Sequence, residues 1–268
     1  MNKNIPWQLQ MFKKTLKKKL RLKALRKHLG YLSSDDQCLL VTCGDNNGAM
    51  NYYLREIGGQ WSWADYETIS ISEMSELLGD KVFHVKEDSL PFSDEFFDCV
   101  VSIDVHEHLM DPDRYTKELY RVTKHGGKIV ITVPNGEEGR LVTKIRNSVG
   151  MTKEKYGHVR EGFGLSELSD LLIRNGFRPL GESSFSRFFT EMLELSINFA
   201  YLNILGKKSG PRDEAETIAP ATKDQLKSIE RTYRLYSLIY PFFWLISKLD
   251  IVFWGSVGYV VMVEGKKE

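Results

Sequence analysis

The residues from 39 to 67 constrain this chain most, because they encode a strand, a tight loop, a helix, a second strand and an acid in that order. The loop contains Gly44 and Gly48, and glycine lets a backbone come close to a ligand. The helix after the loop would present unpaired N–H groups to an anionic group. Asp65 follows about twenty residues later, where an acid can accept two hydrogen bonds from a ribose diol. This order predicts a pocket for a cofactor that contains a nucleoside.

The residues inside the loop discriminate between two classes of cofactor. A nicotinamide dinucleotide site uses G-x-G-x-x-G, whose glycines bring the backbone onto a pyrophosphate. This loop reads C-G-D-N-N-G from Cys43, and its Asp45 would repel a pyrophosphate but could accept a hydrogen bond from an ammonium. S-adenosylmethionine carries a ribose, an ammonium and a carboxylate but no phosphate. The loop alone leaves a dehydrogenase as the alternative, and the motifs further along the chain favour S-adenosylmethionine.

Three further motifs follow the loop. Residues 85–102 read V-K-E-D-S-L-P-F-S-D-E-F-F-D-C-V-V-S, residues 106–109 read H-E-H-L, and residues 119–135 read L-Y-R-V-T-K-H-G-G-K-I-V-I-T-V-P-N. In this order they resemble the motifs of class I S-adenosylmethionine-dependent methyltransferases of type 11, and more narrowly the quinone-biosynthesis C-methylases. The resemblance covers residues 38 to 184 and the last dozen residues. It implies methyl transfer from S-adenosylmethionine and says little about the acceptor.

Apolar runs and helical patterns alternate between residues 38 and 135, which is typical of a parallel sheet with helices on both faces. Strands are predicted at 38–43, 60–65, 81–85, 97–103, 127–133, 178–184 and 258–264, and helices at 48–58, 71–78, 112–124 and from 166. The resemblance implies an α/β, Rossmann-like sheet of seven strands, mostly parallel with the last strand antiparallel, and a helical insertion before that strand. Residues 135–165 are predicted to form a long polar loop.

The chain divides into four predicted parts. A basic N-terminal helical arm covers residues 1–30, the S-adenosylmethionine-binding core covers 31–187, an apolar helical insertion covers 188–254, and the final core strand covers 255–268. Three cysteines lie without metal-ligand spacing, as expected of reduced thiols. The N-terminus has no apolar signal core. We therefore expect a cytoplasmic protein that can be peripheral on the cytoplasmic face of a membrane.

Charge is distributed unevenly, although the net charge is only +1. Ten lysines and arginines and no acid precede Asp35, which leaves 27 basic against 36 acidic residues in the rest. A basic arm on an acidic body predicts an anionic partner. Apolar residues at 12, 16 and 20 and at 22, 25 and 29 lie on two faces, which predicts a bend near Arg21 or one helix clamped on both sides. The arm either caps the cofactor pocket or lies on an anionic membrane surface. Nucleic acid is disfavoured, because aromatic and basic residues do not interleave further along the chain.

The predicted insertion contains two apolar stretches, at residues 188–205 and 235–254, on either side of a polar linker at 206–224. Neither reaches the ~20 unbroken apolar residues that span a bilayer, and Pro241 is expected to bend the second. The stretches either form a helical subdomain that packs on itself or an amphipathic lid for a lipidic acceptor or a membrane surface. Their density of tyrosine, tryptophan and phenylalanine favours the lid.

The resemblance implies a set of cofactor contacts. Asp65 would bind the ribose diol, Tyr66 would lie along the adenine, Asp88 or Ser89 would meet the adenine amino group, and Asp104 would lie beneath the methionine part. The loop would contribute Thr42, Cys43, Gly44, Asp45 and Gly48. The chain departs from the family at two positions, because Leu40 and Thr42 replace the usual acid and first glycine of the first motif. Asp45 and the loop carbonyls are the expected substitutes for the contact to the ammonium.

Methyl transfer from a sulfonium needs alignment, desolvation and sometimes a base. A histidine is suited to that role, with His158 as the first candidate and His106 as the second, and a hydrogen-bonded structural histidine as the alternative for each. We predict no metal site. The alternative uses Asp104, Glu107 and His108 as ligands of a divalent ion, since some quinone O-methylases of the superfamily carry acid-x-x-Glu-His there.

The sequence thus predicts methyl transfer to a lipid or lipid-linked acceptor, such as a quinone precursor, a polyprenyl-linked sugar or an envelope glycolipid. An anionic membrane surface would contact residues 1–30 and 188–254. A small soluble metabolite is the alternative acceptor. A non-catalytic module that binds S-adenosylmethionine is the alternative function, because the departures at Leu40 and Thr42 permit it.

Overall fold

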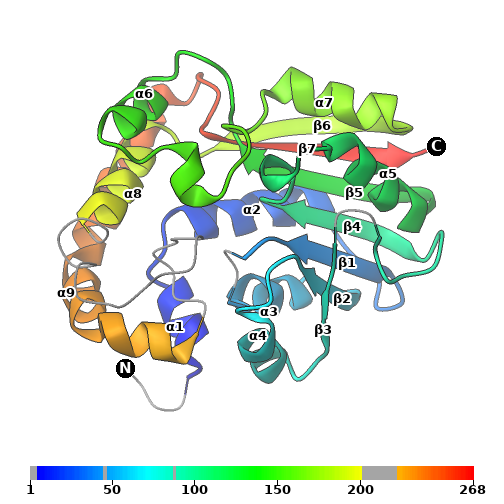
Figure 1. Ribbon diagram of the computed structural model, residues 1–268, viewed down its shortest axis with the longest axis horizontal. Coiled ribbons are helices and arrows are strands. Elements are labelled where there is room, and N and C mark those ends of the chain that lie inside the picture. The colour runs from blue at the N-terminus through cyan, green and yellow to red at the C-terminus, as the bar shows by residue number, and fades with distance from the viewer. Residues whose placement is uncertain (1–4, 45–46, 87–88, 201–221) are drawn as a thin grey trace.

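The computed structural model describes residues 5–44, 47–86, 89–200 and 222–268. One mixed sheet has the strand order β3-β2-β1-β4-β5-β7-β6 (Figure 1). Its strands are β1 (Gln37–Thr42), β2 (Gln60–Asp65), β3 (Val82–His84), β4 (Phe97–Ile103), β5 (Thr123–Pro134), β6 (Phe177–Phe185) and β7 (Val260–Lys267). Strands β1 to β5 pair in parallel, whereas β7 lies antiparallel between β5 and β6. The predicted seven-stranded Rossmann-like fold with an antiparallel last strand is confirmed.

Helices cover both faces of the sheet, and alternate strand residues supply the two cores. Leu40 of β1 packs in one core with α2 (Lys17–Leu29), α3 (Ala49–Arg55) and α4 (Ile71–Leu78). Its neighbours Leu39 and Val41 pack in the opposite core with α5 (Pro112–Val122) and α7 (Leu165–Arg174). All three side chains are fully buried, because a central parallel strand has no face toward water. The unbroken apolar run that predicted this strand therefore reflects burial on both sides.

The N-terminal residues form two helices, but the predicted break near Arg21 is wrong. Helix α1 (Trp7–Phe12) ends before α2 begins at Lys17. The Thr15 hydroxyl donates to the Phe12 carbonyl over 2.9 Å at the turn between them. Helix α2 is anchored on the sheet, where His28 Nε2 lies 2.7 Å from the Ser183 hydroxyl. The leucines of α2 belong to the same core as Leu40, so the turn lets residues of both helices pack inward.

Residues 135–165 contain more regular structure than the predicted polar loop. Helix α6 (Leu141–Ser148) follows β5, and the 3₁₀ helix η2 (Lys153–Tyr156) follows α6. Helix α6 packs on α8 (Phe188–Ala200) through a small apolar cluster that contains Val142, Met151 and Leu195. The expectation of a loop was wrong, because this region is stabilised by tertiary contacts among these three buried residues. Those contacts leave no local pattern in the sequence.

The predicted insertion consists of α8, α9 (Lys223–Ser247) and the 3₁₀ helix η5 (Lys248–Phe253), and most of the predicted linker lies outside the described residues. Helix α9 continues through Pro241. The elements α6, α8, α9 and α1 stand beside the carboxyl ends of the parallel strands (Figure 1). This layer lies on the side of the sheet where ligands of such folds bind.

Three tyrosines of α9 fasten this helix to the segment between α1 and α2. The hydroxyls of Tyr233, Tyr236 and Tyr240 donate to the carbonyls of Gln10, Lys14 and Thr15, over 3.3, 2.5 and 3.2 Å. Several basic residues of the arm also find partners within the fold: Lys14 with the Ser237 carbonyl, Lys17 with Glu191, Lys19 with Tyr240, Arg21 with Asp104 and Arg26 with Glu56. Many of the basic residues of the N-terminal arm therefore bind groups of the protein itself.

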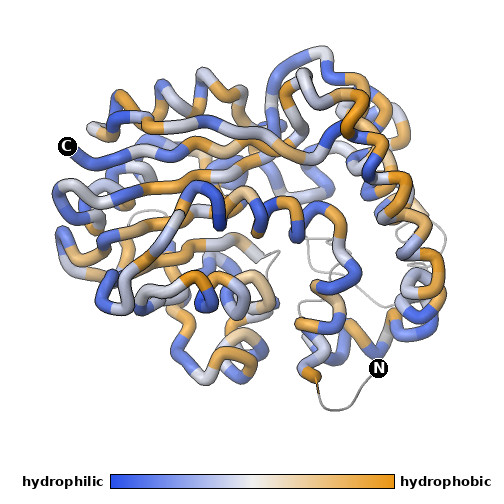
Figure 2. Tube along the Cα trace, turned by 180° about the vertical axis from the view of Figure 1, so that it is seen from behind, coloured by the Kyte–Doolittle hydropathy of each residue, from blue (hydrophilic) through white to orange (hydrophobic). Residues whose placement is uncertain are grey.

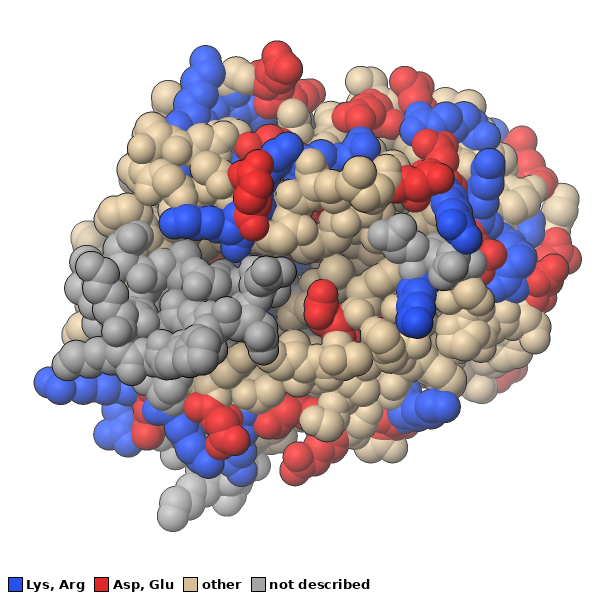
Figure 3. All heavy atoms as spheres, in the orientation of Figure 1, with Lys and Arg blue, Asp and Glu red and all other residues tan. Residues whose placement is uncertain are grey.

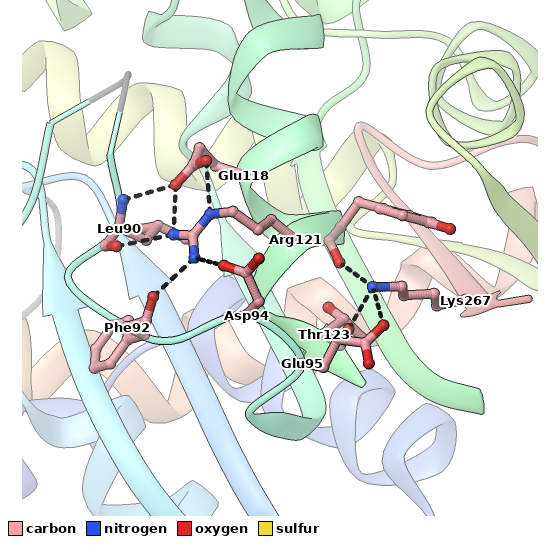
Figure 4. A network of polar contacts seen from close by, with 9 residues as sticks. Leu90, Phe92, Asp94, Glu95, Glu118, Arg121, Thr123 and Lys267 are labelled. Atoms are coloured by element: carbon pink, nitrogen blue, oxygen red, sulfur yellow. Dashed lines mark hydrogen bonds and ion pairs between the residues drawn. The ribbon is translucent and has the colours of Figure 1, made fainter. Parts of the chain in front are cut away.

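Arg121 fixes the loop that carries the L-P-F motif (Figure 4). Its guanidinium donates to the carbonyls of Leu90 and Phe92 over 3.0 and 2.9 Å. It also pairs with Asp94 and Glu118, whose negative charges hold the pKa of Arg121 above its usual value against the opposing effect of burial. The arginine of the R-V-T-K motif thus has a structural role, since it ties the segment after β3 to α5.

Candidate active site

The glycine loop at the end of β1 is held by Asp65 at the end of β2. The Asp65 side chain is fully buried. One of its oxygens accepts hydrogen bonds from the N–H groups of Gly44 and Glu67 over 2.9 and 2.8 Å. The other accepts from the hydroxyl of Thr42 at 2.5 Å. Burial raises the pKa of Asp65, and these hydrogen bonds oppose that shift. This geometry argues against the predicted ribose contact of Asp65, because both oxygens already serve protein donors.

Glu67 is the acid that lies open beside the same loop. Its side chain is exposed, and a Cβ added to Gly44 would come within 2.8 Å of its Cγ. Gly44 also has φ +66°, in the left-handed region that favours glycine. Asp65 and Glu67 stand two residues apart, yet one is buried under the loop and the other faces out. Glu67 is therefore placed to receive a ribose diol while Asp65 shapes the loop.

A small cavity lies between the loop and the N-terminal helices. Its volume is about 30 Å³, room for one or two water molecules. Thr42, Cys43 and Asp104 line it from the sheet side, and Phe12, Lys18 and Arg21 line it from the arm. Arg21 Nη2 lies 2.5 Å from the Asp104 carboxylate. The arm therefore covers the carboxyl ends of β1 and β4, which agrees with its capping alternative.

Several acidic side chains act on Cys43, which lines this cavity. Burial raises the pKa of the Cys43 thiol, and the carboxylates of Asp65, Glu107, Glu67 and Asp104 raise it further. A negative potential of this kind attracts a positively charged ligand. Figure 3 shows a hollow near the middle of the face that it draws, with acidic atoms at its edge. The acids on the sheet side suit the positive sulfonium of S-adenosylmethionine, whereas Lys18 and Arg21 add positive charge on the arm side.

The structure describes some of the remaining predicted cofactor residues and not others. Gly48 precedes α3 with φ +86°. Tyr66 packs edge-on against Tyr115, with ring centroids 5.7 Å apart. Ser89 is exposed at the L-P-F loop. Asp45 and Asp88 lie outside the described residues, so their predicted contacts to the ammonium and to the adenine stay predictions.

His106 belongs to the core and does not suit the role of a base. It is fully buried, and its Nε2 lies 3.2 Å from the Thr116 hydroxyl. Its ring packs against Tyr115 at 4.9 Å. Burial lowers the pKa of His106 to about 3, with a further contribution from Arg160. A fully enclosed imidazole cannot reach an acceptor, so the structural alternative for this histidine is the one that the geometry supports.

His158, the first candidate base, lies beside the H-E-H-L motif. Its ring centroid is 4.6 Å from that of His108. Burial lowers the pKa of His158 to about 3, and the neighbouring His108 adds to this effect. An efficient general base has a pKa near the working pH, so this imidazole is poorly matched to proton abstraction. Burial raises the pKa of Glu107 well above its ordinary value, with a further contribution from Asp104.

Sequence reasoning missed the contacts of two residues near this site. Arg21 was assigned to a bend, but it closes the cavity on Asp104. His158 was treated as an isolated base, but it lies against Glu107 and His108. A signal for Arg21 was present in the sequence. Arg21 lies between two apolar stripes, and a helix that is apolar on two sides needs a packing partner on each side. No local signal could join His158 to a motif fifty residues away.

Part of the chain matches a known protein family. The family described as a methyltransferase domain matches residues 39–131. An uncharacterized protein of Methanocaldococcus jannaschii is 38% identical over 112 residues, which are 41% of this chain and 52% of that protein. The match thus spans about half the length of that relative.

Two solved structures show the same fold. A candidate methyltransferase of Bacillus halodurans superposes with a TM-score of 0.56 at 17% identity, over 92% of this chain and 98% of that one. A phosphoethanolamine N-methyltransferase of Haemonchus contortus, in complex with S-adenosylhomocysteine, superposes with a TM-score of 0.57 at 17% identity, over 92% of this chain and 52% of that one. The match over residues 39–131 and the shared fold agree with the class I S-adenosylmethionine-dependent methyltransferase that the motifs of the sequence predict.

Proposed function

We propose that the chain transfers the methyl group of S-adenosylmethionine to a lipidic or lipid-linked acceptor while it is bound to the cytoplasmic face of a membrane. The observation that carries this proposal is a run of exposed apolar side chains along α9 and η5. Figure 2 shows hydrophobic residues along the trace of these two elements. Leu238 and Trp254 are 79% and 77% exposed. We call this run the apolar face, which consists of Leu235, Leu238, Ile239, Phe242, Trp244, Leu245, Leu249, Ile251, Val252, Phe253 and Trp254.

Such a face is costly in water, since exposed apolar patches mark contacts with proteins, ligands or membranes. The opposite side of α9 is already occupied, because its tyrosines bond to the segment between α1 and α2. The apolar face therefore points away from the fold. Its tryptophans and phenylalanines are residue types that insert into the boundary between head groups and acyl chains.

An interfacial position is favoured over a membrane-spanning one. By length and composition alone, residues 229–253 form one helix that could cross a membrane, and 6% of its most apolar window is buried. However, Tyr236 and Tyr240 tie that helix to the N-terminal segment along one side. The exposed Arg234–Glu230 pair also lies within it. A helix with one face held by protein and the other apolar fits a surface position.

The apolar face and the cofactor cavity belong to one layer of the fold. Asp250 of η5 accepts hydrogen bonds from the N–H groups of Arg187 and Phe189, over 2.9 and 2.8 Å, where α8 begins. Glu191 of α8 pairs with Lys17 over 3.1 Å, one helical turn before the Arg21 that lines the cavity. A lipid that leaves the bilayer beside η5 would therefore meet elements that border the cofactor.

The enzyme would act mainly by alignment and exclusion of water. The methyl group is activated by its sulfonium, so placement of the acceptor atom in line with the S–CH₃ bond supplies much of the rate enhancement. Closure of the arm over Asp104 would keep water out of the cavity. Glu67 would hold the ribose, and the acidic surroundings would hold the cation.

Flotation with anionic liposomes tests the membrane contact. We expect the wild type to float and the double variant Leu238→Glu/Trp254→Glu to stay in the lower fraction. Tyr31→Glu is the matched control, because Tyr31 is 89% exposed and lies outside the apolar face. Equal flotation of the double variant and the wild type would refute the proposed face. Resistance to carbonate extraction would favour a spanning helix instead.

Labelled methyl transfer tests the acceptor class. The purified chain is incubated with methyl-labelled S-adenosylmethionine and a cell extract, which is then partitioned between chloroform and water. Label in the organic phase supports a lipidic acceptor, and label in the aqueous phase supports a small soluble metabolite. A chain that binds S-adenosylmethionine in calorimetry but labels neither phase would be a non-catalytic binding module.

A further inference from the structure

Three metal-ligating side chains meet beside the cavity, from two distant parts of the chain. Glu107 and His108 belong to the 3₁₀ helix η1 (His106–His108) that follows β4, and His158 follows η2. One carboxylate oxygen and one ring nitrogen of each histidine all lie within 4.8 Å of one another. This spacing is suited to a single ion that contacts all three atoms.

Glu107 lacks the partners that a buried carboxylate requires. Its side chain is fully buried, and neither oxygen accepts a hydrogen bond from another described residue. The neighbouring Asp104 pairs with Arg21 through one oxygen, and its other oxygen also has no partner among the described residues. Buried carboxylates are normally paired or coordinate metals, because an isolated buried charge is very costly. The carboxylates of Glu107 and Asp104 thus have fewer positively charged partners among the described residues than these two acids require.

The backbone fixes the positions of the three groups. The Glu107 carbonyl accepts a hydrogen bond from the N–H of Val159 over 2.9 Å, which docks the His158 segment on η1. His108 Nδ1 lies 3.1 Å from the Gly157 carbonyl. A carbonyl only accepts, so Nδ1 carries the proton and Nε2 carries the lone pair. Histidine ligands of metals commonly donate their second nitrogen to a carbonyl in this way.

We propose that Glu107, His108 Nε2 and a ring nitrogen of His158 bind a divalent transition-metal ion. Two imidazoles and one carboxylate form the ligand set of open catalytic zinc sites and of related iron sites, whereas Mg²⁺ prefers oxygen ligands. Three protein ligands leave at least one coordination position for another molecule. This proposal departs from the predicted absence of a metal: it shares Glu107 and His108 with the alternative ligand set and adds His158.

The role of the ion rests on the proposed methyl transfer. Asp104, beside Glu107, lines the cavity at the end of β4, so an acceptor oxygen on the ion would lie at the cofactor. Coordination lowers the pKa of a hydroxyl, whose proton passes to water. An oxygen lone pair then forms the new C–O bond as the S–CH₃ bond breaks, and that bonding pair stays on sulfur. The acceptor class is therefore a hydroxyl-bearing molecule.

Calorimetry on the chelator-treated full chain tests the site without cofactor or acceptor. We expect one equivalent of Zn²⁺ to bind, and Glu107→Gln and His158→Gln to weaken this binding by about 100-fold. His125→Gln is the matched control, because His125 is exposed elsewhere. His158→Gln keeps the test valid if Glu107→Gln fails to fold, since His158 is only half-buried. Absence of saturable binding to the folded wild type, or equal affinity in His158→Gln and the wild type, would overturn the site.

A second measurement separates this site from the proposed function. Methyl transfer by the wild type is measured after chelation and again after one equivalent of Zn²⁺ is restored. Activity that falls and returns supports the site. Full activity in the metal-free enzyme would overturn the metal's role while leaving methyl transfer intact. Zn²⁺ binding that depends on His158, in a chain without methyl transfer, would support the site and refute the proposed function.

Discussion

Replacement of Asp65 by alanine distinguishes a loop-shaping acid from a ribose-binding acid. In the structure the Asp65 carboxylate serves the N–H groups of Gly44 and Glu67 and the Thr42 hydroxyl. The hydroxyl can turn to the Ala64 carbonyl, 3.5 Å away. The two N–H groups have no such substitute. The variant therefore leaves two donors unpaired beneath the glycine loop.

The magnitude follows from those two donors. An unsatisfied buried donor costs about 1–3 kcal/mol, and these two N–H groups are partly buried, so together they cost about 3 kcal/mol. Removal of the carboxylate offsets part of this cost, because a buried carboxylate is itself destabilised by the loss of water around it. The same desolvation raises the pKa of Asp65. We expect a net loss of about 2 kcal/mol in the free energy of unfolding, which lowers Tm by roughly 4–8 °C. Asp65→Asn keeps an acceptor for both N–H groups and should cost about 1 kcal/mol.

Calorimetric unfolding and S-adenosylmethionine titration form the assay, with Glu67→Ala as the comparison. Glu67 is exposed, so its replacement should change stability by less than about 0.5 kcal/mol. It should weaken cofactor binding by about 1.5–3 kcal/mol, or about 10- to 150-fold, because charge-assisted hydrogen bonds to the ribose are lost. The reasoning is refuted if Asp65→Ala keeps its Tm and loses cofactor binding while Glu67→Ala binds normally. That result would restore Asp65 as the ribose acid.

Three further predictions concern single contacts. Arg21→Met leaves the Asp104 carboxylate without its cation, so we expect about 3 kcal/mol lower stability in denaturant melts. The same variant should bind S-adenosylmethionine faster in stopped flow because the arm is released, and an unchanged rate would contradict its closing role. Arg121→Ala should lose about 2 kcal/mol and expose residues 89–95 to hydrogen exchange, whereas native protection there would contradict its clamping role. His106→Gln should keep methyl transfer at close to the wild-type rate, and a loss beyond about 100-fold would reinstate His106 as a base.

The order of strands and helices could be predicted from the sequence, because the buried strands of a parallel sheet are apolar and its covering helices are amphipathic. Helix α4 and strands β2 and β4 begin and end where the pattern placed them. Each central strand is covered on both faces, so it appears as an unbroken apolar run between amphipathic helices. Residues 135–165 were predicted less well, since α6 is stabilised by α8 from a later part of the chain.

The candidate site was predictable only in part. The sequence located the loop, the acids at the strand ends and the class of cofactor, because parallel strands bring their carboxyl ends to one edge. It could not tell Asp65 from Glu67, since which of two nearby acids is buried depends on the donors supplied by the neighbouring strand β1 and the loop after it. The same limit applied to His106, whose burial is imposed by α5.

The sequence by itself determined that this chain folds as a methyltransferase, because local patterns and motifs report burial and backbone geometry. Only the tertiary structure decided how the accessory segments are used. It turned the basic arm into a cover that pairs Arg21 with Asp104, and it left the apolar face of α9 and η5 open to a partner. It also brought His158 to Glu107 and His108. Contacts between distant segments depend on the three-dimensional path of the chain, and no local pattern encodes them.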